Sequence, residues 1–279
     1  MPTISLIIAV YRRLDALELI FKGLQAQSFK DFEVIVAEDD DLPETKQFVR
    51  LQNAAGVFPV KHVFQEDTGF RKNRILNAAI RIAAAESVVF LDGDCIPHRH
   101  LLREYARRLQ PNLALYGRRA MLSESLTAEL LRKGNLGRLT FPNLLLSGCR
   151  RAEDALYLPW LPMRRRTSSG IWGCNWGVLT KHLVDVNGFD EDYVKASVGE
   201  DADIGWRLHA SGVAMQSVKH KAVTYHLYHR PHYDQAIVRE NLEIFLQKKS
   251  TGRFFCRNGL DKRWGEGREG VPSAGTIAP

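Results

Sequence analysis

Short apolar runs alternate with segments of helical periodicity in the first part of the chain. The runs lie at residues 5–10, 32–37, 60–64 and 87–91. They have the length and the β-branched content of strands buried on both faces. The helical segments lie at residues 14–27, 43–54, 73–85 and 98–109. Strands that alternate with helices predict βαβ units, and therefore an α/β fold with a mostly parallel central sheet flanked by helices.

The pattern weakens after residue 110. Residues 122–166 mix helical signal with proline-rich apolar patches, which predicts an excursion or flap rather than part of a sheet. Further on, the spacing predicts helices near residues 181–186, 202–211 and 234–249, and one or two strands within 213–225. From residue 251 the chain is rich in glycine and charge, so we expect residues 251–279 to form a flexible tail.

Composition narrows the class of protein. Of the 279 residues, 45% are hydrophobic and 25% are charged, which is typical of a soluble globular protein and argues against a largely disordered chain. No apolar run reaches the ~18–20 residues of a membrane helix, and the first ten residues resemble a strand rather than a signal peptide. The four cysteines form no CxxC pair, so we expect no zinc or redox motif and a reducing cytoplasm.

Positive charge is concentrated in one segment. The whole chain has a formal net charge of +7, whereas residues 99–170 hold 14 Lys/Arg and 5 Asp/Glu. These charges form either ordinary solvated faces or a surface for anionic lipid headgroups or a phosphorylated acceptor. No aromatic-interleaved RNA motif, zinc finger or basic heptad region accompanies them, so we expect no nucleic-acid partner.

A pair of carboxylates follows a predicted strand. Asp92-Gly93-Asp94 comes directly after the apolar run at 88–91 and is followed by Cys95-Ile96-Pro97. Two aspartates separated by a small residue often mark a turn, but at the end of a buried strand they suit one divalent cation with its bound diphosphate. Hard oxygen ligands favour Mg²⁺ or Mn²⁺.

Three further groups of residues are candidates for chemistry. Glu200-Asp201 begins a predicted helix, where acids stabilise the helix dipole or present a general base. His226 and His229 follow a predicted strand, and a third metal ligand beside two carboxylates is expected there, with His226 preferred. Residues 69–74 open a helix with cations that suit a diphosphate or are simply solvated.

These motifs together resemble the family 2 glycosyltransferases. The likeness is greatest to the subgroup typified by the N-terminal domain of chondroitin polymerase, and the C-terminal half also resembles the β-1,4-galactosyltransferase region. The matching blocks run in family order, and they include Gly69-Phe70-Arg71-Lys72, Asn187-Gly188-Phe189-Asp190 and Gly199-Glu200-Asp201. The complete set lies at residues 5–11, 32–39, 62–72, 90–97, 173–175, 187–191, 199–201 and 226–229.

The resemblance implies a GT-A (Rossmann-like) fold in one domain over residues 1–250. Residues 1–98 would bind the nucleotide-sugar, 99–170 would be the basic excursion, and 171–250 would form the acceptor-side C-terminal subdomain. It also implies an inverting, metal-dependent transferase with Mn²⁺ or Mg²⁺. A nucleotide-sugar, with UDP expected, would donate to a glycan or lipid-linked acceptor in surface polysaccharide or lipopolysaccharide synthesis. The protein would be cytoplasmic, with peripheral contact to anionic membrane at the inner face.

The resemblance also implies a role for each site residue. Tyr11 would stack near the uracil, Asp39 would hydrogen-bond it, and Arg71 would lie near the diphosphate. Asp201 would be the catalytic base, and Glu200 beside it would bind the acceptor or donor sugar. Residues implied for the metal are Asp94, Asp92 and His226, with His229 as the alternative. Those implied for the acceptor are Asn175 and Trp176, and those implied for the donor are Ala9, Tyr11, Asp39, Arg71, Asn77, Asp92, Gly93 and Asp94.

The chain departs from the family pattern at several places. Leu76-Asn77 stands where the family has an Arg-Asn pair, and Arg74 is the nearest replacement for the missing cation. The turn at 38–41 lacks the usual glycine, and residues 195–199 replace a Gly-Trp-Gly loop. The donor sugar, the acceptor and the linkage therefore do not follow from the resemblance.

Two other functions compete with this interpretation. A non-catalytic glycan- or nucleotide-binding protein on a transferase fold is compatible with the altered loops, but it would not need Asp92, Asp94 and Asp201 together. A sugar-1-phosphate nucleotidyltransferase needs a glycine-rich loop after the first strand, where this chain reads Ala9-Val10-Tyr11-Arg12-Arg13.

Overall fold

A large twisted sheet forms the centre of the computed structural model, which describes residues 1–163, 165–166, 171–196, 199–230 and 235–261. Its strands follow the order β3-β2-β1-β4-β9-β6-β10-β8. Their bounds are Val60–Phe64, Phe32–Glu38, Ile4–Val10, Ser87–Asp92, Asn175–Leu179, Leu113–Tyr116, Ala214–Ser217 and Arg165–Arg166. The first four are parallel to one another, and β9 runs antiparallel between β4 and β6. This is the mostly parallel α/β sheet that the apolar pattern predicts.

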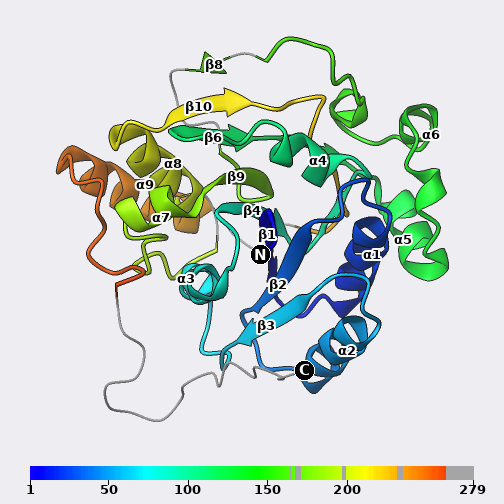
Figure 1. The fold of residues 1–279 in the computed structure, drawn as a ribbon, viewed down its shortest axis with the longest axis horizontal. Coiled ribbons are helices and arrows are strands. Elements are labelled where there is room, and N and C mark those ends of the chain that lie inside the picture. Colours follow the sequence, from blue (N-terminus) through cyan, green and yellow to red (C-terminus); the bar gives the residue numbers. More distant parts are fainter. Residues whose placement is uncertain (164, 167–170, 197–198, 231–234, 262–279) are drawn as a thin grey trace.

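Helices cover both faces of the sheet (Figure 1). Alternate residues of β1 point to opposite faces, so Leu6 and Ile8 belong to one buried cluster and Ile7 to the other. Figure 1 shows α1 and α2 on one side and α3, α7 and α8 on the other. The helices are α1 Leu14–Gln25, α2 Pro43–Ala54, α3 Lys72–Ile82, α4 Leu101–Ala106, α5 Glu124–Lys133, α6 Phe141–Leu146, α7 Thr180–Asp185, α8 Glu200–Ala210 and α9 Gln235–Ser250.

A second, three-stranded sheet joins distant parts of the chain. It has the order β5-β11-β7, with bounds Cys95–Pro97, Val223–His226 and Arg118–Met121. The antiparallel register of β5 and β11 pairs Cys95 with His226. This register brings the histidines of the second half beside the Asp92-Gly93-Asp94 turn of the first half.

The apolar pattern predicts the first half better than the second. Strands β1 to β4 and helices α1 to α4 are confirmed, with ends that differ by a few residues. The strands β6, β7 and β9 are absent from the prediction, because they are short and lie among glycine, arginine and tryptophan residues. The excursion at 122–166 is largely helical as expected, but Arg165–Arg166 pairs with β10, so the expectation that no part of it joins the sheet is wrong.

A buried ion pair anchors helix α8 to the loop after α7. The Arg207 Nε donates to the Asp203 Oδ2 at 2.6 Å, and both side chains are almost fully buried. The Arg207 Nη1 also donates to the carbonyl oxygens of Val186 and Gly188, at 2.7 and 2.8 Å. The charge of Asp203 is therefore balanced inside the protein, as a buried carboxylate requires.

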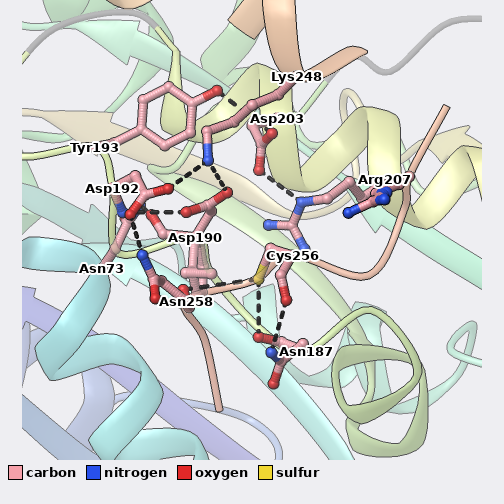
Figure 2. A network of polar contacts seen from close by, with 12 residues as sticks. Asn73, Asn187, Asp190, Asp192, Tyr193, Asp203, Arg207, Lys248, Cys256 and Asn258 are labelled. Atoms are coloured by element: carbon pink, nitrogen blue, oxygen red, sulfur yellow. Dashed lines mark hydrogen bonds and ion pairs between the residues drawn. The ribbon is translucent and has the colours of Figure 1, made fainter. Parts of the chain in front are cut away.

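The segment after α9 packs onto the same loop (Figure 2). Lys248 Nζ lies 2.6 Å from carboxylate oxygens of both Asp190 and Asp192, and Asn187 Nδ2 donates to the Cys256 carbonyl oxygen at 2.8 Å. Cys256 is 5% exposed. Packing therefore continues to Asp261, whose backbone N–H donates to Asn187 Oδ1, and this moves the domain boundary beyond the expected residue 250. The rest of the expected tail, 262–279, lies outside the described residues.

Within the described part of the chain, no helix combines the length and the apolar character that a bilayer-spanning helix requires.

We expect Arg207→Met to lower the free energy of unfolding by about 3–5 kcal/mol, because it leaves the buried Asp203 carboxylate without its partner. Urea unfolding measures the change. The matched control is Lys181→Met, which removes an exposed ion pair to Asp185 in α7 and should cost about 0.3–0.5 kcal/mol. Equal effects of the two substitutions would contradict a structural role for the buried pair.

Candidate active site

The carboxyl ends of β1, β2 and β4 meet at one edge of the parallel sheet, where ligands of such folds bind. Gly93 follows β4 and lies directly against the end of β1. A Cβ added at Gly93 would lie 2.5 Å from the carbonyl oxygen of Ala9. Because Gly93 has no side chain, the Asp92-Gly93-Asp94 turn can approach β1 closely. Ala9 and Gly93 therefore contribute to the site through the close contact of their backbones.

Three potential metal ligands converge beside this turn. The Asp94 Oδ2 lies 3.2 Å from the His226 Nε2 and 3.0 Å from the His229 Nε2. One ligand atom from each of the three residues lies within 4.8 Å of the others. The register of β5 and β11 brings them together, and the Leu227 N–H fixes it further by donating to the Asp94 carbonyl oxygen at 2.9 Å. Both histidines join Asp94, although the sequence offered His229 only as an alternative.

The donor atoms of this triad suit a divalent cation. Burial opposes ionisation of Asp94, yet the hydrogen bonds of His226 and His229 hold its pKa well below its usual range. The hydrogen bond to Asp94 raises the pKa of His229. In the part of the chain that the structure describes, His226 Nδ1 is buried and has no hydrogen-bond partner. A carboxylate and two imidazoles form a mixed oxygen and nitrogen donor set, which fits Mn²⁺ better than Mg²⁺ with its preference for oxygen.

Asp92 is not part of the Asp94, His226 and His229 cluster, and its expected role as a metal ligand stays a prediction. The Lys72 Nζ is 3.0 Å from the Asp92 Oδ1, and the Arg119 Nη1 is 3.7 Å from its Oδ2. Asp92 is the last residue of β4, two residues before Asp94, and its carboxylate is turned toward these two cations. Its negative charge is therefore balanced by protein groups and not shared with the His226 and His229 cluster.

The expected base lies at the N-terminus of α8. The Asp201 Oδ2 accepts a hydrogen bond from the Gly173 N–H at 2.7 Å, and a Cβ at Gly173 would lie 2.7 Å from the Asp201 Oδ1. Burial raises the pKa of Asp201, an effect that the Lys72 charge reduces. Burial and the neighbouring Asp201 charge raise the pKa of Glu200 to about 8. Burial thus raises the pKa of both carboxylates, so each holds a proton more readily than an exposed carboxylate does.

Lys72 is the cation between these carboxylates. Besides its contact with Asp92, the Lys72 Nζ lies 3.9 Å from the Glu200 Oε1. Burial would lower its pKa, but the charges of Asp92, Asp201 and Glu200 raise the pKa of Lys72 above its ordinary value. Lys72, Asp92, Gly173 and Asp201 line one pocket, which Ala9, Leu76, Phe90, Leu91, Trp176 and Phe189 complete.

Residues implied for the nucleotide lie at the rim of the site. Tyr11 is half exposed, and its hydroxyl donates to the Asp67 carboxylate at 3.1 Å. Asp39 follows β2 and is buried; it accepts hydrogen bonds from Gln65 Nε2 at 2.5 Å and from the Arg71 N–H at 2.8 Å. Burial raises the pKa of Asp39. The Arg71 guanidinium donates to the carbonyl oxygen of Glu66, so it does not share the pocket of Lys72.

Three implied ligand residues are buried in the structure. Asn77 is fully buried and exchanges hydrogen bonds with the backbone of Phe189, which corrects its expected contact with the donor. Asn175 is also buried; it accepts from the Tyr105 hydroxyl and donates to the Ala222 carbonyl oxygen, so its amide is not available at the acceptor side. Trp176 is buried, stacks on Phe90 at 4.4 Å, and forms part of the pocket wall.

Sequence reasoning did not single out Lys72, Arg119 or Gly173. Lys72 stands in the recognised 69–74 segment and lies one helical turn before Leu76, on the same face of α3. That spacing is the signal that favours Lys72 over Arg74 as the cation of the pocket. Arg119 had been counted only as part of the basic excursion, and no local pattern distinguishes it from the surrounding arginines.

Comparison with known proteins assigns the family. Residues 2–243 match the sequence profile described as "Glycosyltransferase like family 2". The chain belongs to this glycosyltransferase family. A validoxylamine A glucosyltransferase of Streptomyces hygroscopicus subsp. jinggangensis is 27% identical over 236 residues, which cover 77% of this chain and 53% of that protein. The family 2 chain thus spans about half the length of the curated relatives it matches.

Another relative, which matches over a shorter segment, has a name that includes a lipid-linked acceptor. A "GalNAc(5)-diNAcBac-PP-undecaprenol beta-1,3-glucosyltransferase" of Campylobacter jejuni is 34% identical over 95 residues, covering 34% of this family 2 chain and 30% of the relative.

Solved structures show that the chain has the GT-A fold. The mannosyltransferase PcManGT of Pyrobaculum calidifontis, solved with GDP-Man and Mn²⁺, superposes with a TM-score of 0.61 at 18% identity over 90% of this chain and 64% of its own. S. aureus TarS 1–349 gives a TM-score of 0.60 at 16% identity, over 93% of this chain and 67% of its own. The likeness to the chondroitin-polymerase subgroup stays a prediction.

We expect Lys72→Met to weaken the binding of a nucleoside diphosphate with Mn²⁺ by about tenfold or more, because the negative charges of Asp92 and Asp201 would then lie near the bound phosphates without their shared cation. Calorimetry with UDP measures the change. Lys72→Arg should retain most of the affinity, and Lys181→Met, on the exposed side of α7, should leave it unchanged. An unaltered affinity in Lys72→Met would contradict this role.

The raised pKa of Glu200 predicts a pH-dependent stability. The folded protein keeps the proton of the Glu200 carboxyl group up to about pH 8, whereas the unfolded chain releases it near pH 4.5. The free energy of unfolding of the wild type therefore declines between these two pH values, by a few kcal/mol at most. Glu200→Gln lacks this decline. The melting temperature of the variant relative to wild type should therefore rise between pH 5 and pH 8, and a constant difference would be inconsistent with a buried, protonated Glu200.

Proposed function

We propose that the protein is an inverting, metal-dependent glycosyltransferase that moves a sugar from a nucleotide-sugar, with UDP as the expected nucleotide, to a hydroxyl group of a glycan or lipid-linked acceptor. One observation carries the proposal. The Asp94, His226 and His229 cluster lies at the Asp92-Gly93-Asp94 turn after β4, and Asp92, the last residue of that strand, lines one pocket with Lys72 and Asp201. The candidate cation site for a diphosphate and the candidate base thus both adjoin the end of β4.

The base side of the pocket supplies the proton acceptor. Asp201 is held by the Gly173 N–H, and its raised pKa makes it a better base than an exposed aspartate. In the proposed reaction, Asp201 takes the proton of the acceptor hydroxyl while that oxygen forms a bond to the anomeric carbon. The bond from this carbon to the diphosphate breaks on the opposite face, and the electron pair leaves with the nucleotide. Configuration at the anomeric carbon therefore inverts.

The donor side stabilises the leaving group. When bound, a divalent cation held by Asp94, His226 and His229 would neutralise the negative charge of the diphosphate. Lys72 supplies a further positive charge in the same pocket, and Arg119 balances the far oxygen of Asp92. Glu200, protonated near neutral pH, donates a hydrogen bond to a sugar hydroxyl without adding a charge.

The relatives support a sugar transfer without agreeing on the acceptor. Both relatives are named as glucosyltransferases, one acting on validoxylamine A and the other on a glycan linked to PP-undecaprenol. The structural neighbour PcManGT was solved with Mn²⁺ and GDP-Man, which supports a metal and leaves the nucleotide between UDP and GDP. Synthesis of surface polysaccharide and peripheral contact with anionic membrane at its cytoplasmic face stay predictions.

Nucleotide release across UDP-, GDP- and dTDP-sugars with Mn²⁺ tests the proposal. We expect slow hydrolysis of one donor, lost on chelation of the metal and lowered at least 100-fold in Asp94→Ala. Asp201→Asn should lower turnover by about 10²–10⁴-fold while donor binding by calorimetry persists. The released sugar, observed early by proton NMR, should have the anomeric configuration opposite to that of the donor.

The matched control is Asp185→Asn, which removes an exposed carboxylate of α7 and should behave as wild type. Wild-type turnover in Asp201→Asn would refute the assigned base. If no nucleotide of the panel binds with or without metal, the non-catalytic interpretation replaces this one.

A further inference from the structure

Helix α9 has an outer side that combines leucines with cations. Every residue of α9 is described, and Asn241 alone is buried, so the helix rests on the protein along one side. Leu242 and Leu246 lie one helical turn apart and are 43% and 53% exposed. Arg239 and Lys249 are exposed three residues before and after this pair, on the same side of the helix.

Two exposed phenylalanines follow the helix. Phe254 and Phe255 are 41% and 50% exposed. Gly252 has a left-handed φ of 68° and turns the chain after α9. Beyond this turn, the carbonyl oxygen of Cys256 accepts a hydrogen bond from Asn187 Nδ2 at 2.8 Å (Figure 2). The backbone next to the two phenylalanines is therefore fixed, while their side chains remain exposed.

The helix and the phenylalanines belong to one edge of the molecule. Figure 1 shows α9 and the segment that follows it at the left edge of the view, on the opposite side from α2. Arg253 is also exposed in this segment. We call the exposed residues of this edge the α9 surface: Leu242, Leu246, Lys249, Arg253, Phe254 and Phe255.

Cations outnumber acids at the α9 surface. Glu240 pairs with Lys195 of the loop after α7, so the protein itself neutralises this carboxylate. Glu243 is exposed near the leucines. Lys249 and Arg253 form no ion pair with any carboxylate of the residues that the structure describes. The charge beside the exposed apolar side chains is therefore positive on balance.

An anionic lipid surface is the partner with the matching chemistry. Helices that lie in a membrane interface place leucine and phenylalanine at the boundary between headgroups and acyl chains, and they place lysine and arginine at anionic headgroups. The core of a protein–protein interface is instead depleted of lysine and of other charged residues. Four exposed apolar side chains interleaved with cations therefore favour a membrane over a second protein.

We propose that the α9 surface docks on an anionic lipid bilayer, with its four apolar side chains at the headgroup boundary and its two cations on the lipid phosphates. This deepens the proposed transferase function and rests on it, since an enzyme that glycosylates a lipid-linked acceptor must reach that acceptor at a membrane. The proposal assigns the contact to α9 and the loop at 251–257, and not to the basic segment at 99–170.

Vesicle flotation tests the surface without nucleotide or metal. The full chain is floated with vesicles of phosphatidylcholine alone, or of phosphatidylcholine with about 30% phosphatidylglycerol. We expect binding to the anionic vesicles to be tighter by about tenfold or more. Raising the salt from about 50 to about 300 mM should weaken this binding without abolishing it, because salt screens the cations and not the apolar contact.

Variants locate the contact. Leu246→Gln and Phe255→Gln should each weaken binding to the anionic vesicles by about five- to tenfold, and Lys249→Gln by about fivefold. The matched controls are Leu51→Gln and Arg50→Gln in α2, where the leucine is 60% exposed and the arginine is also exposed. Both controls should bind as the wild type does. Melting temperatures show whether each variant remains folded.

Three results of the flotation would overturn the proposal: equal binding to neutral and anionic vesicles, wild-type binding by Leu246→Gln, or the same loss in Leu51→Gln as in Leu246→Gln. Light scattering supplies a fourth. A wild-type dimer that Leu246→Gln dissociates would assign the α9 surface to a second copy of the chain.

Failure of the transferase function gives a different result. In that case no nucleotide-sugar binds or is hydrolysed, whereas the flotation still separates the α9 variants from the α2 controls. If the α9 surface fails instead, the chain does not float with anionic vesicles, and its metal-dependent hydrolysis of a donor in solution is unaffected.

Discussion

The partly buried ammonium group of Lys72, helped by Arg119, balances the acidic half of the site. Asp92, Glu200 and Asp201 come from two distant parts of the chain, and each would resist burial as an unpaired anion. Lys72 lies 3.0 Å from Asp92 and 3.9 Å from Glu200, and its charge also lowers the proton affinity of Asp201. The pocket exists in this form because the first residue of α3 places a cation where β4 and α8 meet.

The metal cluster depends on a different constraint, the register of the small second sheet. Pairing of β5 with β11 sets Cys95 opposite His226, so Asp94 meets two histidines that follow it by more than 130 positions. A slip of one residue would turn His226 to the other face of its strand. The Leu227 N–H, bound to the Asp94 carbonyl oxygen, holds this register at the site itself.

The fold places the basic side chains of residues 99–170 in different surroundings. Arg108 neutralises a buried glutamate under the loop at 156–162, Arg119 faces the carboxylates of the pocket, and Arg118 and Arg151 stack on Trp172. A net excess over residues 99–170 therefore does not describe one uniform surface. Charges are also balanced around the loop after α7, since Lys248 of α9 pairs with Asp190 and Asp192 of the loop, and Arg207 pairs with Asp203 within α8.

The amino-acid sequence by itself determined the class of fold, the parallel half of the sheet and the main acidic residues. Hydrophobic periodicity indicates which face of an element is buried. Asp94 and Asp201 belong to short motifs that can be recognised from the order of the residues alone. Only the tertiary structure decided which neighbours these residues have. Asn175 is in a recognised block and Asn77 stands at the family's Arg-Asn pair, yet both bind backbone groups in the interior, and Asp92 pairs with Lys72. The tertiary structure also decided that β6, β7 and β9 form strands. These strands are too short to show a clear hydrophobic pattern, and their stability comes from neighbours that are distant in sequence.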